Sequence, residues 1–122
     1  MNFKQHLESI LGRVEGAAGA LIMGTDGIAV EKVLGEAGSE ANLDVAAAEF
    51  VSVIRGAERA SDNMGYGPLR ELIVSTDQFH LILRLVARDY FLVLAIATGG
   101  NLGRGRFELR KAELDMAREF TF

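Results

Sequence analysis

Hydrophobic positions recur along the chain with two spacings, which together predict three helices and five strands. Apolar residues three or four apart mark the helices, whereas alternating or continuous apolar runs mark the strands. The predicted elements are, in order, Met1–Val14 (helix), Ala18–Met23 and Ile28–Val33 (strands), a helix from Ser39 or Asn42 to about Asn63, Arg70–Ser75, Phe79–Val86 and Tyr90–Thr98 (strands), and Leu102–Glu119 (helix). Because very short links join the last three strands, we expect them to form antiparallel hairpins.

Cap and turn residues support several of these boundaries. Asn2 and Gln5 have the spacing of a capping box for the first helix. The turn Gly24-Thr25-Asp26-Gly27 is typical of a tight hairpin, because aspartate and glycine tolerate left-handed backbone. Gly65 and Pro68 are expected to end the long helix.

The strand patterns also predict positions within a sheet. Phe79–Val86 alternates between leucine-rich and mixed positions, and Tyr90–Thr98 is apolar on both faces. A strand that is apolar on both faces belongs at the centre of a sheet. Ile28–Val33 resembles a half-exposed edge strand, and Arg70–Ser75 is a second candidate edge.

The long helix has a wider uncharged surface than packing on one sheet requires, which is an arc of roughly 100°. Its main stripe consists of Leu43, Ala46, Ala47, Phe50, Ile54 and Ala57. Small residues also repeat at every fourth position, at Ala48, Ser52, Gly56 and Ala60. Two interpretations remain open: a helix well buried in its own domain, or a helix with its own sheet on one side and a partner on the other. We favour the second.

Composition and charge narrow the functional classes. The chain has 122 residues, 49% of them hydrophobic, and a mean hydropathy of +0.18, so we expect one domain that buries part of its apolar surface against another subunit. The net charge is −4 and the pI about 5.2, which argues against a nucleic-acid partner. There is no cysteine. The longest apolar run, Tyr90–Ala97, is too short to span a membrane, and no signal peptide is evident, so we expect a cytoplasmic protein.

The glycine-rich segment "TGGNLGRGR", which follows the last strand, raises the question of a phosphate-binding loop. A Walker loop needs a lysine and a hydroxyl residue that are missing here, and Glu108 stands where a dinucleotide fingerprint has its third glycine. We interpret the segment as a helix N-terminus capped by Asn101. A weaker hypothesis is that Arg104 and Arg106 meet an anion there.

The residues that could carry catalysis form no recognisable set. His6 and His80 lack the partners of a catalytic triad and the spacing of metal ligands. Glu113 and Asp115 are expected to form ion pairs with Arg110 and Lys111 on their own helix. We therefore expect no enzyme activity, no cofactor and no metal, and interpret the chain as an interaction module.

Two segments resemble the roadblock/dynein-light-chain family. "ALIMGTDGIAVEKV" is similar to its first hairpin, and "ELIVSTDQFHLILRLVARDYFLVLAIATGGNLGRGRFELRKA" to its second half. The resemblance implies a single roadblock-like domain over residues 1–122, with a profilin-like α/β fold (an α+β sandwich) whose five-stranded antiparallel sheet is flanked by helices. A short, cysteine-free member looks like the prokaryotic, gliding-regulator-like branch that partners a GTPase.

The resemblance also implies a dimer, either with itself or with a relative. The third strands would pair edge to edge and the long helices would pack together. Carried over, the interface residues are Phe50, Val53, Ile54, Ala57 and Ala60 on the helix and Leu72, Ile73, Val74 and Ser75 on the strand. The loop "LGEAGSEAN" has no family signature, so no partner contact through it is carried over from the family.

The function implied is that of a non-enzymatic regulator or scaffold that binds a small Ras-like GTPase and, in some members, modulates its GTP hydrolysis. Arg55 and Arg59 are candidates for partner contacts and equally for surface ion pairs. One alternative is a profilin-like sensor of a small ligand, which would need convergent polar groups where the sequence places leucine, valine and alanine. Another alternative is a hydrolase that uses His80.

Overall fold

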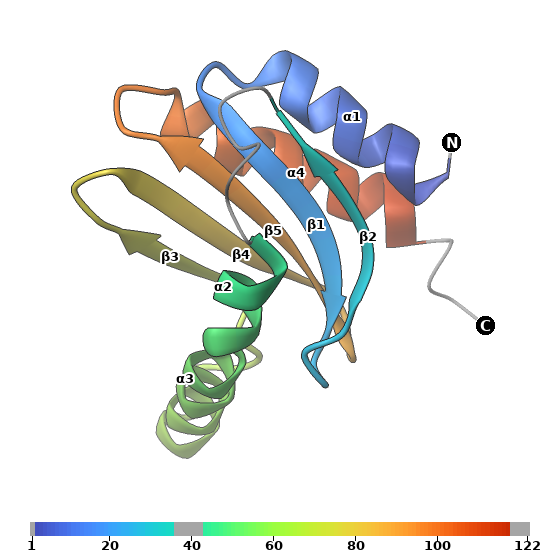
Figure 1. Ribbon diagram of the computed structural model, residues 1–122. Helices are drawn as coiled ribbons and strands as arrows, with labels where there is room; N and C mark the ends of the chain where they lie inside the picture. Colours follow the sequence, from blue (N-terminus) through green and yellow to red (C-terminus); the bar gives the residue numbers. More distant parts are fainter. Residues whose placement is uncertain (1, 36–42, 118–122) are drawn as a thin grey trace.

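The computed structural model describes residues 2–35 and 43–117, which form an antiparallel sheet with helices on both faces (Figure 1). The strand order is β2-β1-β5-β4-β3, and every neighbouring pair is antiparallel. The elements are α1 (Phe3–Arg13), β1 (Ala17–Gly24), β2 (Ala29–Leu34), α2 (Leu43–Glu49), α3 (Val51–Met64), β3 (Glu71–Ser75), β4 (Phe79–Ala87), β5 (Tyr90–Ala97) and α4 (Leu102–Met116). The expected α+β sandwich is confirmed.

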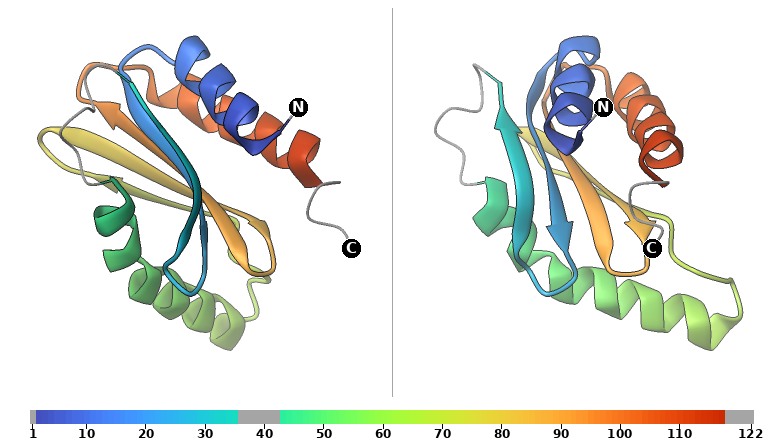
Figure 2. Two further views of the ribbon diagram at one scale, coloured as in Figure 1. Left: turned by 45° about the vertical axis from the view of Figure 1, so that its right-hand side comes forward. Right: turned by 90° about the vertical axis from the view of Figure 1, so that its right-hand side faces the viewer.

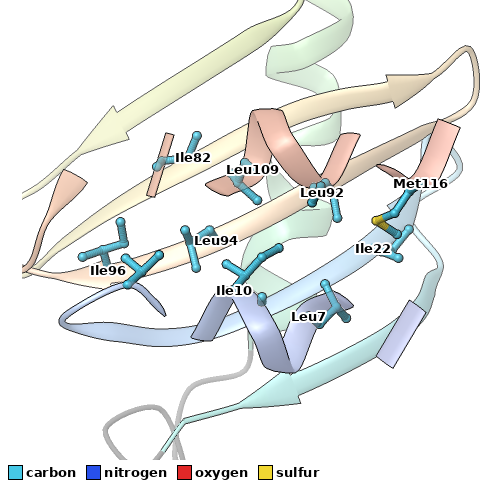
Figure 3. Packing of buried hydrophobic residues seen from close by; sticks show 12 residues of the cluster. Leu7, Ile10, Ile22, Ile82, Leu92, Leu94, Ile96, Leu109 and Met116 are labelled. Carbon is cyan, nitrogen blue, oxygen red and sulfur yellow. The ribbon is translucent and has the colours of Figure 1, made fainter. Parts of the chain in front are cut away.

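Two hydrophobic cores hold the sheet between its helices. Helices α1 and α4 lie side by side over one face (Figure 2), and their side chains pack on it (Figure 3). This core includes Leu7, Ile10, Ile22, Ile82, Leu92, Leu94, Ile96, Leu109 and Met116. The second core lies on the opposite face, beneath α2 and the start of α3, and includes Leu21, Met23, Leu43, Ala47, Ile54, Phe91 and Val93. The sheet is therefore covered on both faces, though unequally.

The predicted places of the strands are confirmed. Strand β5 is central, and six of its eight residues are buried, because both of its faces are covered. Strands β2 and β3 are the two edges. Along β4, Leu83 belongs to the α2 side and Ile82 to the α4 side, as the alternation of the sequence required.

The predicted caps and turns also form. Asn2 and Gln5 make the reciprocal bonds of a capping box, at 2.8 and 2.9 Å. Gly27 in the first hairpin turn and Gly65 at the end of α3 have positive φ values of 85° and 70°. These conformations are the reason for glycine at the two positions.

The prediction of one long helix was wrong, because the segment divides into α2 and α3 at Phe50. Phe50 has φ −87° and ψ −2°, and its N–H donates to the carbonyl of Ala47, three residues back. This tight turn lets α2 follow the sheet while α3 extends along the end of the first hairpin (Figure 2). The proposed caps Ser39 and Asn42 lie outside the described residues.

The glycine-rich segment starts a helix and packs against the chain's own backbone. The Arg104 N–H donates to Asn101 Oδ1 at 2.9 Å, which confirms the cap. A Cβ added to Gly100 would lie 2.6 Å from the Glu15 carbonyl oxygen, and one added to Gly105 would lie 2.5 Å from Ile96 Cδ1. These glycines are explained by close packing without any ligand.

Candidate functional site

Helix α3 is the most weakly covered helix of the structure. Only Ile54 of its fourteen residues is buried, at 1% exposure, whereas Val53 is 45% exposed. Ala57 is half-buried and Ala60 is exposed. A helix that leaves apolar side chains open to solvent in this way has the form of one side of an interface.

The predicted helical interface residues thus divide into two groups. Ile54 and the half-buried Phe50 pack into the second core of their own domain. Val53 and Ala60 face solvent and are available to a partner, with Ala57 between the two groups. The same helix therefore serves its own sheet along one side and leaves the other side open.

Strand β3 is the second element with an uncovered side, because it lies at the edge of the sheet. It bonds to β4 along one edge, from the Glu71–Arg84 pair to the Ser75–His80 pair, and no strand of the described residues bonds to its other edge. Leu72 and Val74 are half-buried and pack against the second core. Ile73 points to the other face of the sheet and is 36% exposed. An open edge with apolar side chains is suited to strand pairing.

An apolar hollow of about 220 Å³ lies between α2 and the β3–β4 end of the sheet. Its lining is Leu43, Ala46, Phe50, Val74, Thr76, Phe79, Leu81 and Ala95. The one lining hydroxyl, on Thr76, donates to the carbonyl oxygen of Phe79 within its own turn. Among the residues that the structure describes, no set of polar side chains converges on this lining, which is the set that a small-ligand sensor would need.

The two candidate arginines of α3 have different surroundings. Arg55 Nη2 donates to the carbonyl oxygen of Thr25 at 2.7 Å and so ties α3 to the β1–β2 turn. Arg59 is exposed on the next turn of the helix, and no ion pair engages it among the described residues. Arg59 is therefore the freer of the two for a partner contact.

The arginines at the start of α4 are paired within the chain, which opposes the anion hypothesis. Arg104 lies 2.8 Å from Glu108 and Arg106 lies 2.9 Å from Glu71. Glu108 is 3% exposed and is also 3.6 Å from Arg13, so it links α4 to the end of α1.

The two histidines lie on different elements, His6 on α1 and His80 on β4. His80 Nδ1 is 2.7 Å from Ser75 Oγ on the adjacent strand, and no carboxylate orients the ring among the described residues. His6 is buried on α1. In the described part of the chain, no three histidine, aspartate or glutamate side chains come close enough to hold a metal ion. No helix there is long and apolar enough to cross a membrane.

The comparison with family models decides the family. The model of the Roadblock/LC7 domain matches residues 4–95, which is most of the chain. The chain belongs to the Roadblock/LC7 family. The family expected from the two sequence segments is therefore confirmed.

This Roadblock/LC7 chain is similar to several solved structures. MglC from Myxococcus xanthus is 35% identical, with 98% of this chain and all of that chain covered, and a TM-score of 0.70. The gliding protein MglB from Thermus thermophilus is 20% identical, with 93% and 84% covered, and a TM-score of 0.84. Profilin IA from Acanthamoeba castellanii is 14% identical over 98% of this chain, with a TM-score of 0.65, which confirms the profilin-like fold. Among curated proteins, none matches.

The sequence analysis missed a basic hollow beside α4. Its lining brings together Arg70, Glu71, Arg84, Arg106, Phe107 and Arg110 from three elements and the segment before β3. Glu113 was expected to pair on its own helix, whereas it accepts a hydrogen bond from Arg84 of β4 at 2.7 Å. One feature of the sequence could have indicated this surface. Phe107 and Leu114 are large apolar residues that fall outside the buried stripe of α4.

Proposed function

We propose that this Roadblock/LC7 chain is a non-enzymatic regulator or scaffold that pairs with a second copy of itself and, as a dimer, binds a small Ras-like GTPase. The observation that carries the proposal is that one side of α3 and one edge of β3 are both open. Family membership and the likeness to the gliding proteins MglC and MglB support it.

A two-fold dimer would close both open elements at once. The β3 edges of two copies would pair into one continuous sheet, which satisfies the backbone groups at that edge. The α3 helices would pack beside this seam through Val53, Ala57 and Ala60, whose small size allows close approach. A two-fold interface uses the same patch on both subunits, and a stable one buries about 1,200–2,000 Å² in total.

The dimer is tested by the molar mass in solution, measured by light scattering over a dilution series. We expect twice the monomer mass down to low micromolar concentration, and Val53→Glu and Ile73→Glu should each shift the midpoint of dissociation upward by about tenfold or more. The matched control is Leu114→Glu, an exposed apolar position on α4. A wild-type monomer at all concentrations would refute the dimer, as would equal effects of the control and the interface variants.

The GTPase partner is tested separately, with the small Ras-like GTPases of the source organism loaded with GDP or with a non-hydrolysable GTP analogue. We expect one loaded form to co-elute with the dimer, and phosphate release from the GTP-loaded form to change when the dimer is added. Arg59→Gln should weaken the complex, because Arg59 is the uncommitted one of the two candidate arginines on α3. If neither loaded form co-elutes at micromolar concentrations, the chain regulates no GTPase directly.

A further inference from the structure

The outer face of α4 carries two large apolar side chains that are largely exposed to solvent. Phe107 is 56% exposed and Leu114 is 69% exposed, whereas the buried side of the helix uses Leu109, Ala112 and Met116. The two exposed side chains are seven residues apart, which puts them on one row of the helix about 10 Å from each other. Phe107 lines the basic hollow, together with Glu71 at the start of β3.

The basic hollow beside this row carries an excess of positive charge. Four arginines and a single glutamate line it, together with Phe107. Arg84 is held by Glu71 and Glu113, at 3.6 and 2.7 Å, and Arg106 is held by Glu71 at 2.9 Å. Arg70 and Arg110 are exposed, and no carboxylate pairs with either one among the described residues. The hollow is therefore locally cationic in a chain whose net charge is −4.

Arginine and an exposed aromatic ring together select a particular chemistry. The guanidinium group is planar and weakly hydrated, and it pairs bidentately with carboxylates. The Arg104 guanidinium lies 5.5 Å from the centre of the Phe107 ring. This cation–π contact helps to fix the ring, which lines one side of the hollow. A matching partner has carboxylates for Arg70 and Arg110 and apolar side chains for Phe107 and Leu114.

From this geometry we propose that the outer face of α4 docks an acidic peptide segment of another protein, with its carboxylates on Arg70 and Arg110 and its apolar side chains on Phe107 and Leu114. A second copy of this chain does not fit, because two-fold pairing of this face would bring the same unpaired arginines together. An anionic membrane fits less well, since the net charge of −4 opposes approach to a negative surface and only two apolar side chains are available to insert. This surface borders the proposed dimer interface at the start of β3, where Glu71 lines the hollow, but its apolar contacts, Phe107 and Leu114, lie on α4.

The probe is a fluorescently labelled amphipathic peptide of about four helical turns, with leucines on one side and glutamates on the other. Its counterpart has lysine at every glutamate position. Binding is measured by fluorescence anisotropy with the full chain. We expect the glutamate peptide to bind about tenfold or more tightly than the lysine peptide, and its affinity to fall with added salt.

Variants locate the binding. Arg110→Gln and Phe107→Ala should each weaken the glutamate peptide by about three- to tenfold. Arg88→Gln is the matched control: it removes the same charge from an exposed turn outside the hollow and should change the affinity by less than about twofold. Both test positions are exposed, so circular dichroism should report an unchanged fold.

Five results would overturn the proposal. One is the absence of binding by the glutamate peptide, and another is equal affinity for both peptides. A third is an equal loss in Arg88→Gln and Arg110→Gln. The fourth is sedimentation with phosphatidylserine vesicles that depends on Arg110 and occurs without peptide binding, which would assign the surface to a membrane. An unchanged dimer mass in Phe107→Ala supports the proposal, whereas a lower mass would assign the surface to a second copy and overturn it.

Discussion

Replacing Gly100 with alanine tests whether the glycine-rich turn is packed against the protein or open to a ligand. The added Cβ would lie 2.5 Å from Ile96 Cγ2, 2.6 Å from the Glu15 carbonyl oxygen and 3.0 Å from the Ala97 carbonyl oxygen. Two of these three atoms belong to the backbone and cannot rotate away. The connection between α1 and β1 must therefore move if the alanine is to fit.

The expected cost combines two effects. Overpacking of a well-packed site typically costs about 1–3 kcal/mol. Moving Glu15 also weakens the hydrogen bond that its carbonyl accepts from the Asn101 N–H at 2.9 Å, which contributes about 0.5–1.5 kcal/mol. The lower entropy of the unfolded alanine chain offsets about 0.4–1 kcal/mol. We therefore expect the free energy of unfolding to fall by about 2–3 kcal/mol.

The assay is urea unfolding followed by far-ultraviolet circular dichroism, at one fixed protein concentration because pairing with a second copy would add to the measured stability. The matched control is Gly12→Ala in α1, where an added Cβ meets nothing within 4 Å. That control should raise the free energy of unfolding by about 0.5–1 kcal/mol. If Gly100→Ala is as stable as the wild type, the turn is open and the packing explanation of its glycines is wrong.

Three further substitutions test the local interactions. Arg84→Met should lower the free energy of unfolding by about 2–3 kcal/mol in the same urea assay, because the largely covered guanidinium pairs with both Glu71 and Glu113. An unchanged unfolding midpoint would mean that these ion pairs contribute nothing to stability. Asn101→Ala removes the cap of α4 and should cost about 1 kcal/mol, whereas Asn101→Ser should restore most of it. The hydrogen bond from Lys32 lowers the pKa of Asp44 below its usual 3.8, so the small stabilisation from this pair is present at neutral pH and is lost as the pH falls through that lowered value. An NMR titration of Lys32→Met should therefore find a higher pKa for Asp44, and an unchanged pKa would contradict this assignment.

The elements and their place in the sheet could be predicted because they depend on local periodicity. Side chains of a strand alternate between faces whatever lies beyond them, so the doubly apolar Tyr90–Thr98 segment had to be central. Asn2, Gln5, Gly65 and Asn101 act within one turn of their own backbone, and all four behaved as the sequence indicated. The wide uncharged surface of the long helix likewise predicted an open side, and α3 has one.

The division of that helix could not be predicted in this way. No glycine or proline marks Phe50, so the sequence contains no helix breaker at this point. The turn forms because Leu43 and Ala47 reach the sheet while α3 follows the end of the first hairpin, where Arg55 contacts Thr25. That geometry depends on segments far apart in the sequence.

By itself, then, the sequence determined the order of the elements, the central and edge strands, the helix caps and the family. Only the tertiary structure decided that one side of α3 would be open, that Gly100 would meet the backbone of Glu15, and that Arg70 and Arg110 would converge beside Phe107. The physical reason is range. Periodicity and capping act over a few residues. The net charge of a patch of surface, and its accessibility, depend instead on which side chains the fold brings together from distant parts of the sequence.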